Sequence, residues 1–282
     1  MNPKHQKAIL DWFDENKRDL PWRKTDAWGV MVSEYMLQQT PVARVLPKWI
    51  EWMERWPTPS HLADAKKSEV ISAWGRLGYP RRALRLYEAA KVIASEHNNT
   101  VPREIETLRE LPGVGDYTAA AIASFAYNES TLVMDINIRR FFSRALDGVQ
   151  HPTSAPSQYE RKIRAELVPH DGAKWAAATM ELGALICTSK NPQCELCPVK
   201  SICEWRRLGF PESAQRPKTQ AWHGTDRQCR GVIVQALRDN KSLSQSQVTE
   251  LWDDQDQVEK ALKTLLADGL IETTGKKFKL AD

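Results

Sequence analysis

Four of the chain's five cysteines lie in one short segment, at Cys187, Cys194, Cys197 and Cys203. Free cysteines are few and are not normally clustered, so scattered buried thiols would not explain this density. Four thiolates this close together indicate a metal site rather than a disulfide framework. Softness alone does not choose between a zinc ion and an iron–sulfur cluster. Only Cys194 and Cys197 form the short pair that zinc ribbons usually contain twice, and Cys229 is predicted to be free.

Two carboxylates occupy positions where they could do acid–base chemistry. Glu34 falls in a predicted helix between apolar residues such as Val30 and Leu37. Apolar surroundings raise the pKa of a carboxyl group, so that it can act as a general acid. Asp135 follows an apolar run and precedes a predicted helix, where an aspartate is most simply an N-cap. Asn137, two residues later, can also bond locally.

A glycine-rich turn, Leu-Pro-Gly-Val-Gly, stands between two predicted helices at residues 111–115. Gly113 and Gly115 permit a tight turn and let backbone N–H groups, including that of Val114, approach a ligand closely. The next helix is predicted to begin near Asp116, so its positive dipole end points the same way. Such a turn is usually an ordinary connection, but these features together would make a sequence-independent phosphate clamp.

The composition limits the class of protein without selecting one. The 282 residues suffice for two domains, and the sequence shows neither a membrane-spanning apolar run nor a signal peptide. We therefore expect a soluble cytoplasmic protein with no membrane partner. The net charge is +4; residues 225–282 carry 9 basic and 10 acidic side chains, which leaves 31 minus 26, or +5, before them. This surplus suits a polyanion partner, although most such surpluses are solvated faces.

Apolar residues recur at helical spacing along nearly the whole chain, and no alternating strand pattern appears before residue 270. Clusters of proline and glycine separate the helical segments. The pattern predicts helices at 4–17, 29–39, 42–55, 60–64, 67–76, 80–97, 103–110, 117–126, 136–146, 155–167 and 172–186.

Residues 225–282 are predicted to form a separate small unit behind a polar linker at 211–224. Two short strands joined around Gly275 would follow three helices, and this order resembles a winged helix. The helices of this unit are predicted at 226–238, 244–252 and 255–268.

Three motifs appear in the order found in one superfamily of repair enzymes. The 6-2-5 spacing of the cysteines resembles the [4Fe–4S] loop of the endonuclease III superfamily of DNA glycosylases. LPGVGDYTAAAIASFAY, followed by VMDINIRR, is similar to the helix-hairpin-helix and downstream aspartate of that superfamily. Asp135 lies 18 residues after Tyr117, the separation seen between the hairpin tyrosine and the essential aspartate of its members. The resemblance implies a mostly α glycosylase fold with one [4Fe–4S] cluster.

The string SEYMLQQT narrows the resemblance to the A/G-specific adenine DNA glycosylases, the MutY family. These enzymes remove adenine mispaired with 8-oxoguanine or guanine. The family implies that Glu34 protonates the adenine ring, that Asp135 handles the sugar cation, and that Gln38 and Gln39 lie at the DNA-facing end of the helix. Tyr117 stands where endonuclease III carries its catalytic lysine, so a monofunctional glycosylase is expected.

The resemblance also implies an architecture and a partner. Residues 1–210 would form the helix-hairpin-helix region, with a six-helix barrel module at about 24–135 and a cluster module made of the N-terminal helix and 136–210. The expected partner is double-stranded DNA that contains an adenine mispair, bound by a monomer associated with the nucleoid. Tyr79 and Lys190 are further expected DNA contacts.

The sequence departs from the family pattern in three places. Pro80 stands where the family often has a second tyrosine that wedges into the DNA, and Met31 stands where many members have tryptophan. The family usually adds a much longer Nudix-like domain that senses 8-oxoguanine, whereas this chain has only residues 225–282. Removal of adenine is therefore better supported than recognition of the opposite base.

Three other functions stay open. A thymine glycosylase for T:G mismatches, with the same fold, shares the hairpin tyrosine and the Asp135–Asn137 pair, but Glu34 and the paired glutamines oppose it. Tyr117 opposes an endonuclease III-like glycosylase/lyase. A non-catalytic, cluster-bearing DNA-binding regulator would not need both carboxylates.

Overall fold

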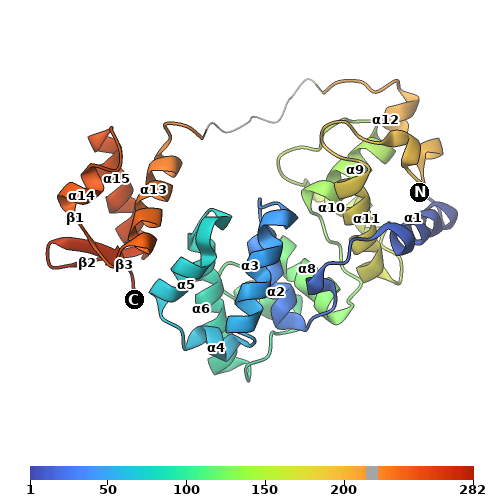
Figure 1. Cartoon of the computed structure of the whole chain (residues 1–282). Helices are drawn as coiled ribbons and strands as arrows, with labels where there is room; N and C mark the ends of the chain where they lie inside the picture. Colours follow the sequence, from blue (N-terminus) through green and yellow to red (C-terminus); the bar gives the residue numbers. More distant parts are fainter. Residues whose placement is uncertain (214–221) are drawn as a thin grey trace. The chain divides into compact units, whose positions relative to one another are not determined.

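The structure is a computed structural model that describes residues 1–213 and 222–282, and helices dominate it (Figure 1). Every helix predicted between residues 4 and 186 is present, with ends that differ by a few residues. The helices are α1 (Pro3–Asn16), α2 (Ala27–Leu37), α3 (Val42–Arg55), α4 (Pro59–Ala63), α5 (Lys67–Trp74), α6 (Arg81–Glu96), α7 (Ile105–Glu110), α8 (Asp116–Tyr127), α9 (Ile136–Asp147), α10 (Gln158–Ala165) and α11 (Gly172–Leu185).

The helical pattern did not predict the short helical turns of the structure. A single turn carries no repeating apolar pattern, so sequence periodicity cannot reveal it. These turns are η1 (Pro21–Arg23), η2 (Gly75–Leu77), η3 (Cys194–Leu196), η4 (Lys200–Ile202) and the four-residue helix α12 (Glu204–Arg207).

The chain folds into two compact units, and each is assembled from separated stretches of sequence. The first unit contains Met1–Val30, Arg103–Arg109 and residues 114–213. The second unit contains Met31–Pro102, Glu110–Gly113 and residues 222–282.

These units do not coincide with the modules predicted from the sequence. The predicted barrel module at about 24–135 includes α8, which lies in the first unit, and the C-terminal residues belong to the second unit. The predicted linker at 211–224 falls mostly on residues 214–221, which lie outside the described residues. The module limits therefore stay a prediction.

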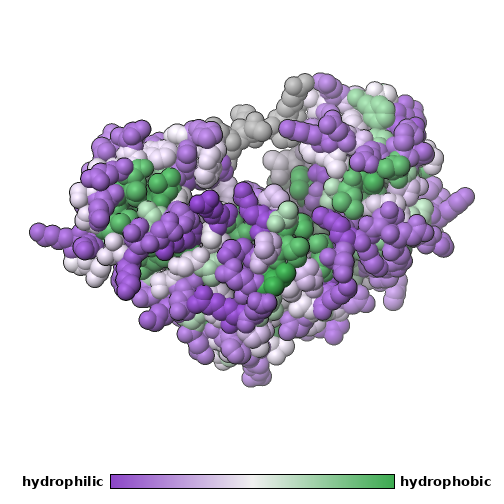
Figure 2. Space-filling model, in the orientation of Figure 1, coloured by the Kyte–Doolittle hydropathy of each residue, from purple (hydrophilic) through white to green (hydrophobic). Residues whose placement is uncertain are grey.

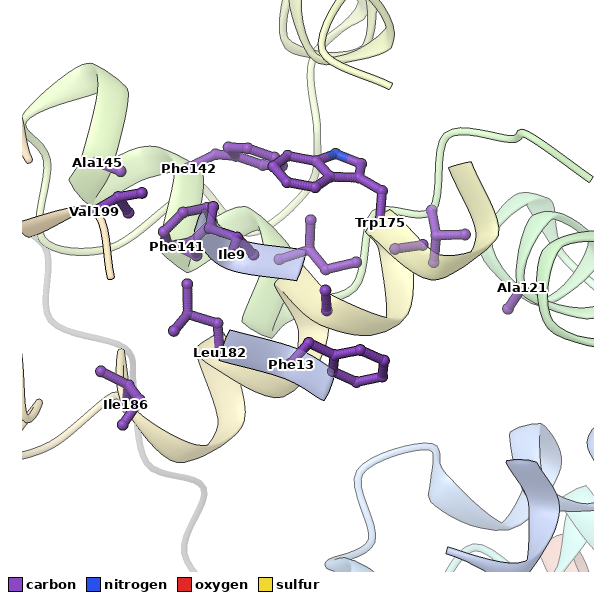
Figure 3. Close-up of a cluster of buried hydrophobic side chains, with 14 of the residues drawn as sticks. Ile9, Phe13, Ala121, Phe141, Phe142, Ala145, Trp175, Leu182, Ile186 and Val199 are labelled. Carbon is purple, nitrogen blue, oxygen red and sulfur yellow. The ribbon is translucent and has the colours of Figure 1, made fainter. Parts of the chain in front are cut away.

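Aromatic and aliphatic side chains of α1, α9 and α11 form the core of the first unit (Figure 3). The ring of Phe142 on α9 lies 5.2 Å from Phe141 and 6.3 Å from Trp175 of α11, between centroids. Ile9 and Phe13 of α1 belong to the same cluster. Because α9 packs along α11, the first turn of α9 is fixed relative to that helix.

A buried ion pair attaches the segment after α1 to α11. Glu181 is 1% exposed and accepts two hydrogen bonds from the Arg18 guanidinium, at 2.9 and 2.6 Å, and one from the Arg18 backbone. Arg23 adds a second cation 3.1 Å from the same carboxylate. Burial alone would raise the pKa of Glu181, but these hydrogen bonds and charges lower it overall.

Tryptophan rings occupy the core of the second unit. Trp52 on α3 meets Trp56 and Trp74 edge-on, with ring centroids 4.8 and 5.5 Å apart. Trp52 and Trp74 are almost completely buried. This packing places three of the chain's eleven tryptophans in the helical core of the second unit.

The C-terminal part of the second unit contains three helices and a small antiparallel sheet, as predicted. The predicted hairpin pairs Ile271 with Leu280 and Thr274 with Lys277, and Gly275 takes the positive φ of 59° that its turn requires. A two-residue strand, too short to show alternation, was not predicted and completes the sheet. The elements are α13 (Asp226–Asp239), β1 (Leu243–Ser244), α14 (Gln245–Thr249), α15 (Gln255–Ala267), β2 (Ile271–Thr274) and β3 (Lys277–Leu280), in the sheet order β1-β3-β2.

These C-terminal elements pack on α5 and α6 of the same unit. Ile71 of α5 is fully buried in the C-terminal hydrophobic cluster. Arg238 of α13 donates to the Ile71 carbonyl at 3.2 Å, and Ser68 bonds to Asp282. The C-terminal elements therefore share a core with α5.

The face of the molecule drawn in Figure 2 shows mainly hydrophilic residues. On the face drawn in Figure 2, hydrophobic atoms appear in small separate patches among hydrophilic ones. Among the described residues, no helix combines the length and apolar character needed to cross a membrane.

Candidate functional site

Asp135 caps the N-terminus of α9 and also bonds to a side chain. Its Oδ1 accepts a hydrogen bond from the Ile138 backbone N–H at 2.6 Å. Its Oδ2 accepts one from Asn137 Nδ2, also at 2.6 Å. Burial raises the pKa of Asp135, although these hydrogen bonds oppose the shift. The N-cap interpretation is thus confirmed, while the second oxygen is held by Asn137.

A buried arginine connects Asn137 to residues 187–203, which contain the four clustered cysteines and are called the cysteine segment. Arg140 is 6% exposed, and its Nη2 donates to Asn137 Oδ1 at 2.8 Å and to the Gly183 carbonyl at 2.6 Å. Its Nε donates to the carbonyl of Cys187 at 2.7 Å. A continuous set of hydrogen bonds therefore runs from Asp135 through Asn137 and Arg140 to Cys187.

Close packing of α9 against α11 brings these groups together. A Cβ added to Gly183 would lie 2.5 Å from the Asn137 carbonyl oxygen, closer than real Cβ contacts come. Only glycine therefore fits at this position without moving the backbone of α9.

A second buried arginine of α9 holds the cysteine segment itself. Arg144 is 1% exposed, and its Nη1 donates to the Thr188 carbonyl at 2.7 Å and lies 3.5 Å from the sulfur of Cys187. Its guanidinium also lies 4.6 Å from the ring centroid of Trp205. Sequence reasoning missed Arg140 and Arg144, although arginines among the apolar positions of a buried helix were an available signal.

The four clustered cysteines line one pocket, as their spacing predicted. The pocket also includes Arg144 and Trp205, and the cysteines are not paired in disulfides. Among the described residues, no three His, Cys, Asp or Glu side chains converge as ligands of a single metal ion. The cysteines are Cys187, Cys194, Cys197 and Cys203.

The chemistry of this pocket fits an iron–sulfur cluster. Burial raises the pKa of the Cys197 thiol to about 12 and also raises the pKa of Cys194 and Cys203. Buried thiolates therefore need the positive charge of a bound metal group. Four sulfur donors around one pocket match the ligand set of an iron–sulfur cluster.

The glycine-rich turn has the tight geometry that its sequence predicted. Gly113 has a φ of 83°, and a Cβ there would lie 2.8 Å from the Cβ of Arg85. Tyr35 donates to the carbonyl of Pro112 at 2.5 Å, which holds the beginning of the turn. Gly115 is the N-cap of α8, whereas the side chain of Val114 is buried. Only the backbone of Val114 can therefore contact a ligand.

Glu34 lies on α2 and is 6% exposed, so it is not a solvated carboxylate on an open helix face. Its neighbours Val30 and Met31 are also buried. Tyr117, in the first turn of α8, packs partly buried against the core of the first unit. Glu34 belongs to the second unit and Tyr117 and Asp135 belong to the first.

Arg82 organises the two loops that carry the predicted DNA contacts of the second unit. Its Nη1 donates to the Gln38 carbonyl at 2.6 Å, and its Nη2 donates to the Gly78 carbonyl at 3.0 Å. The residues beyond these carbonyls, Gln39 and Tyr79, have positive φ values of 54° and 46°. Non-glycine residues rarely adopt this conformation, and it is concentrated at functional sites.

The basic residues of the cysteine segment differ in their availability. Lys200 and Arg206 both pair with Glu195, at 3.2 and 2.7 Å. The side chain of Lys190 is exposed and makes no ion pair with the described residues. Of these cations, Lys190 is therefore the one best able to contact a phosphate.

Two family models match the chain. Residues 32–168 match the HhH-GPD superfamily of base excision DNA repair proteins, and residues 187–203 match the iron–sulfur binding domain of endonuclease III. The helix-hairpin-helix fold and the iron–sulfur segment predicted from the sequence are thus confirmed.

Curated relatives match the chain over most of its length. An adenine DNA glycosylase of Mycolicibacterium smegmatis is 48% identical and covers 97% of this chain and 94% of its own. One from Mycobacterium tuberculosis is 46% identical, covering 94% and 90%. The adenine DNA glycosylase of Homo sapiens is 42% identical over 71% of this chain, and the match covers 39% of the human protein.

Solved structures share the fold. A thermostable thymine-DNA glycosylase has a TM-score of 0.67 and 26% identity, over 73% of this chain and 98% of its own. Endonuclease III in a non-covalent DNA complex has a TM-score of 0.63 at 20% identity, over 73% and 95%. The second likeness is one of fold alone.

Replacement of Arg140 by methionine is expected to destabilise the protein by about 2 to 5 kcal/mol. The buried carbonyl of Gly183 loses the Arg140 donor, and that of Cys187 keeps only the longer bond of 3.4 Å from Arg144. Urea unfolding measures the loss. Arg206→Met is the matched control, since it removes an exposed ion pair and is expected to cost less than about 1 kcal/mol. Equal stability of the two variants would show that the Arg140 bridge contributes nothing.

Proposed function

Because the chain belongs to the adenine DNA glycosylase family, we propose that it removes adenine mispaired with 8-oxoguanine or guanine in double-stranded DNA. The observation that carries the proposal is the environment of the two carboxylates. Glu34 is buried among apolar side chains, and Asp135 is held by Asn137 at the start of α9.

In the proposed reaction, adenine is flipped out of the helix before the bond is cleaved. Glu34 donates a proton to the adenine ring, so the base leaves with the electron pair of the glycosidic bond and without negative charge. Asp135 stabilises the positive sugar carbon or attacks it, and a water molecule supplies the hydroxyl of the product. The two carboxyl groups therefore need opposite protonation states, with Glu34 protonated and Asp135 ionised.

Asn137 and Arg140 are positioning residues in this proposal. The bond from Asn137 fixes one oxygen of Asp135, and Arg140 fixes the amide of Asn137. The amide therefore cannot rotate away from the carboxylate without breaking its bond to a buried guanidinium.

Tyr117 supports a monofunctional reaction. A glycosylase that also cleaves the strand needs an amine to form a Schiff base with the sugar. Tyr117 has no amine, and it lies at the start of α8, where the hairpin ends. The expected product is therefore an abasic site in an unbroken strand.

DNA binding is supported by the fold, since solved structures of the same fold contain DNA. We assign the backbone of residues 113–115 to phosphate contact, Gln38, Gln39 and Tyr79 to the DNA around the extruded adenine, and Lys190 to a phosphate. The proposal assumes a monomer that acts on the nucleoid in the cytoplasm.

The proposed cofactor is one [4Fe–4S] cluster held by Cys187, Cys194, Cys197 and Cys203. When bound, it supplies positive charge that stabilises the buried thiolates and fixes the cysteine segment. Through Arg140, the order of this segment extends to Asn137 and Asp135.

A thymine glycosylase for T:G mismatches is the second candidate, because one structure of the same fold is a thymine-DNA glycosylase. The buried Glu34 disfavours it, since a proton donor beside the base suits adenine, which is protonated as it leaves. The third candidate is a DNA-binding protein without activity. The assay of base release described next tests all three candidates.

The protein is expected to release adenine from A:8-oxoG and A:G duplexes and to leave T:G and thymine-glycol duplexes intact. Because it forms no Schiff base, the product strand should break only after alkali. Gel analysis with and without alkali measures both properties. Thymine release, or breakage without alkali, would assign the protein to another class, and binding without base release would make it a regulator.

Glu34→Gln and Asp135→Asn are each expected to lower the single-turnover rate of adenine release at least about 100-fold while keeping affinity for the mispair. Burial raises the pKa of Asp135, so the wild-type rate should fall with decreasing pH already above the ordinary aspartate range near 3.8. A pH–rate profile measures this limb. Near-normal rates in either variant would remove that residue from the mechanism.

Purified protein is expected to be brown, with about four irons per chain. Cys197→Ser removes the thiol whose pKa burial raises to about 12. This variant should lose iron and unfold at lower temperature. Cys229→Ser is the control, because Cys229 lies in the C-terminal core. This variant should keep the iron content of the wild type. A colourless protein with stoichiometric zinc would contradict the cluster assignment.

A further inference from the structure

An arginine of the C-terminal elements stacks with two exposed aromatic residues. Arg227, in the first turn of α13, lies 5.1 Å from the ring centroid of Trp222 and 5.8 Å from that of Tyr79. Its Nη1 also donates to the Tyr79 hydroxyl at 2.9 Å. Trp222 is 47% exposed and Tyr79 is 45% exposed. We call Trp222, Arg227 and Tyr79 the aromatic–arginine stack.

The segment that carries Trp222 is fixed to α13 and α15. Thr225, the N-cap of α13, donates to the Trp222 carbonyl at 2.8 Å. Gln257 of α15 donates to the Gly224 carbonyl at 3.0 Å. The Trp222 ring lies over α13 beside Gly231, where an added Cβ would be 3.9 Å from it. The backbone that carries Trp222 is therefore held by both helices.

The stack continues the surface of the loops that carry Gln38 and Gln39. The guanidinium of Arg82 lies 5.7 Å from the Tyr79 ring centroid and bonds to the Gln38 carbonyl. Arg82 thus joins the stack to the residues assigned above to DNA contact. The C-terminal elements reach this surface through Arg227.

The charges near the stack favour an anionic partner. Asp226 is paired with Lys260, and Asp268 is paired with Arg81 and Arg230. These two aspartates are therefore neutralised, although residues 225–282 carry a net charge of −1. The β-ribbon is the hairpin of β2 and β3, and on it Lys279 is already paired with Glu272 and Asp282.

We propose that the aromatic–arginine stack binds the DNA strand opposite the excised adenine, with the unpaired purine of the mispair stacked on Trp222. Exposed tryptophan offers a stacking face for an unstacked base, and a guanidinium donates to phosphate or to the acceptor oxygens of a purine edge. The inference rests on the proposed function, because only a mispair from which adenine is extruded leaves that purine unpaired.

The test compares the affinity of each variant for two duplexes. One contains a non-hydrolysable adenosine analogue opposite 8-oxoguanine, and the other is fully paired. Trp222→Ala is expected to weaken binding to the mispair about 5- to 150-fold and to leave binding to the paired duplex unchanged, because only the mispair supplies an unstacked base. Trp222→Phe should retain most of the affinity, since it keeps an aromatic face.

Two controls distinguish stacking on Trp222 from a general effect of losing an exposed aromatic ring and from DNA contact by the β-ribbon. Tyr159→Ala removes an exposed aromatic residue of α10 and should change neither affinity. Lys277→Ala tests the β-ribbon as the DNA contact; a loss of mispair affinity there, with none for Trp222→Ala, would overturn the proposal. Arg227→Lys, which keeps the charge but loses the planar fork, should also weaken mispair binding.

A purely structural role makes a different prediction. If Trp222 and Arg227 only attached the C-terminal elements to Tyr79, their variants would lower the melting temperature and keep the ratio of the two affinities, and the inference would be wrong. Wild-type protein that neither prefers the mispair nor releases adenine would instead refute the proposed function. A normal wild type with an unchanged Trp222→Ala ratio would refute the stack alone.

Discussion

The buried guanidinium of Arg140 is the interaction on which the rest of the first unit's site depends. A desolvated cation needs all its donors satisfied, and here the acceptors come from α9, α11 and the cysteine segment. The geometry of Asp135 is therefore tied to segments that lie about fifty residues further along the chain. A group that fixes the cysteine segment therefore also fixes the Asp135 carboxylate. If Cys187 or Asn137 moved, Arg140 could not keep its hydrogen bonds to the two residues.

In the second unit, too, one arginine guanidinium holds separate backbone segments together. Arg82 donates to backbone carbonyls at the end of α2 and in the turn before α6, where helical hydrogen bonds stop. Burial lowers the pKa of Arg82 to about 10, so it remains charged at neutral pH and its bonds persist. The strained conformations of Gln39 and Tyr79 are stable because the hydrogen bonds of Arg82 hold the loops on either side in place.

The sequence allowed the helices, the cysteine pocket and the N-cap Asp135 to be predicted because each depends on residues close together in the chain. Helical periodicity is local, and so is the spacing of four cysteines. The sequence could not show which groups Arg140 and Arg82 bind, because the carbonyls of Gly183, Cys187 and Gln38 lie 43 to 47 residues away from them. Only the burial of Arg140 had a signal, namely its place among the apolar positions of a helix. Strand β1 was missed for another reason: two residues cannot show alternation.

The C-terminal elements make two separate contacts within the second unit: one with α5 and one between Arg227 and Tyr79. Ile71 and Arg238 attach them to α5 through a shared core, which would suffice for a simple cap. That core leaves the other end of α13 free to position Arg227 beside Tyr79. The contacts with α5 position α13, and a stacking surface that is already positioned loses less entropy on binding. In the proposed function, the C-terminal elements would extend the DNA-contacting surface by holding Trp222 and Arg227 beside Tyr79.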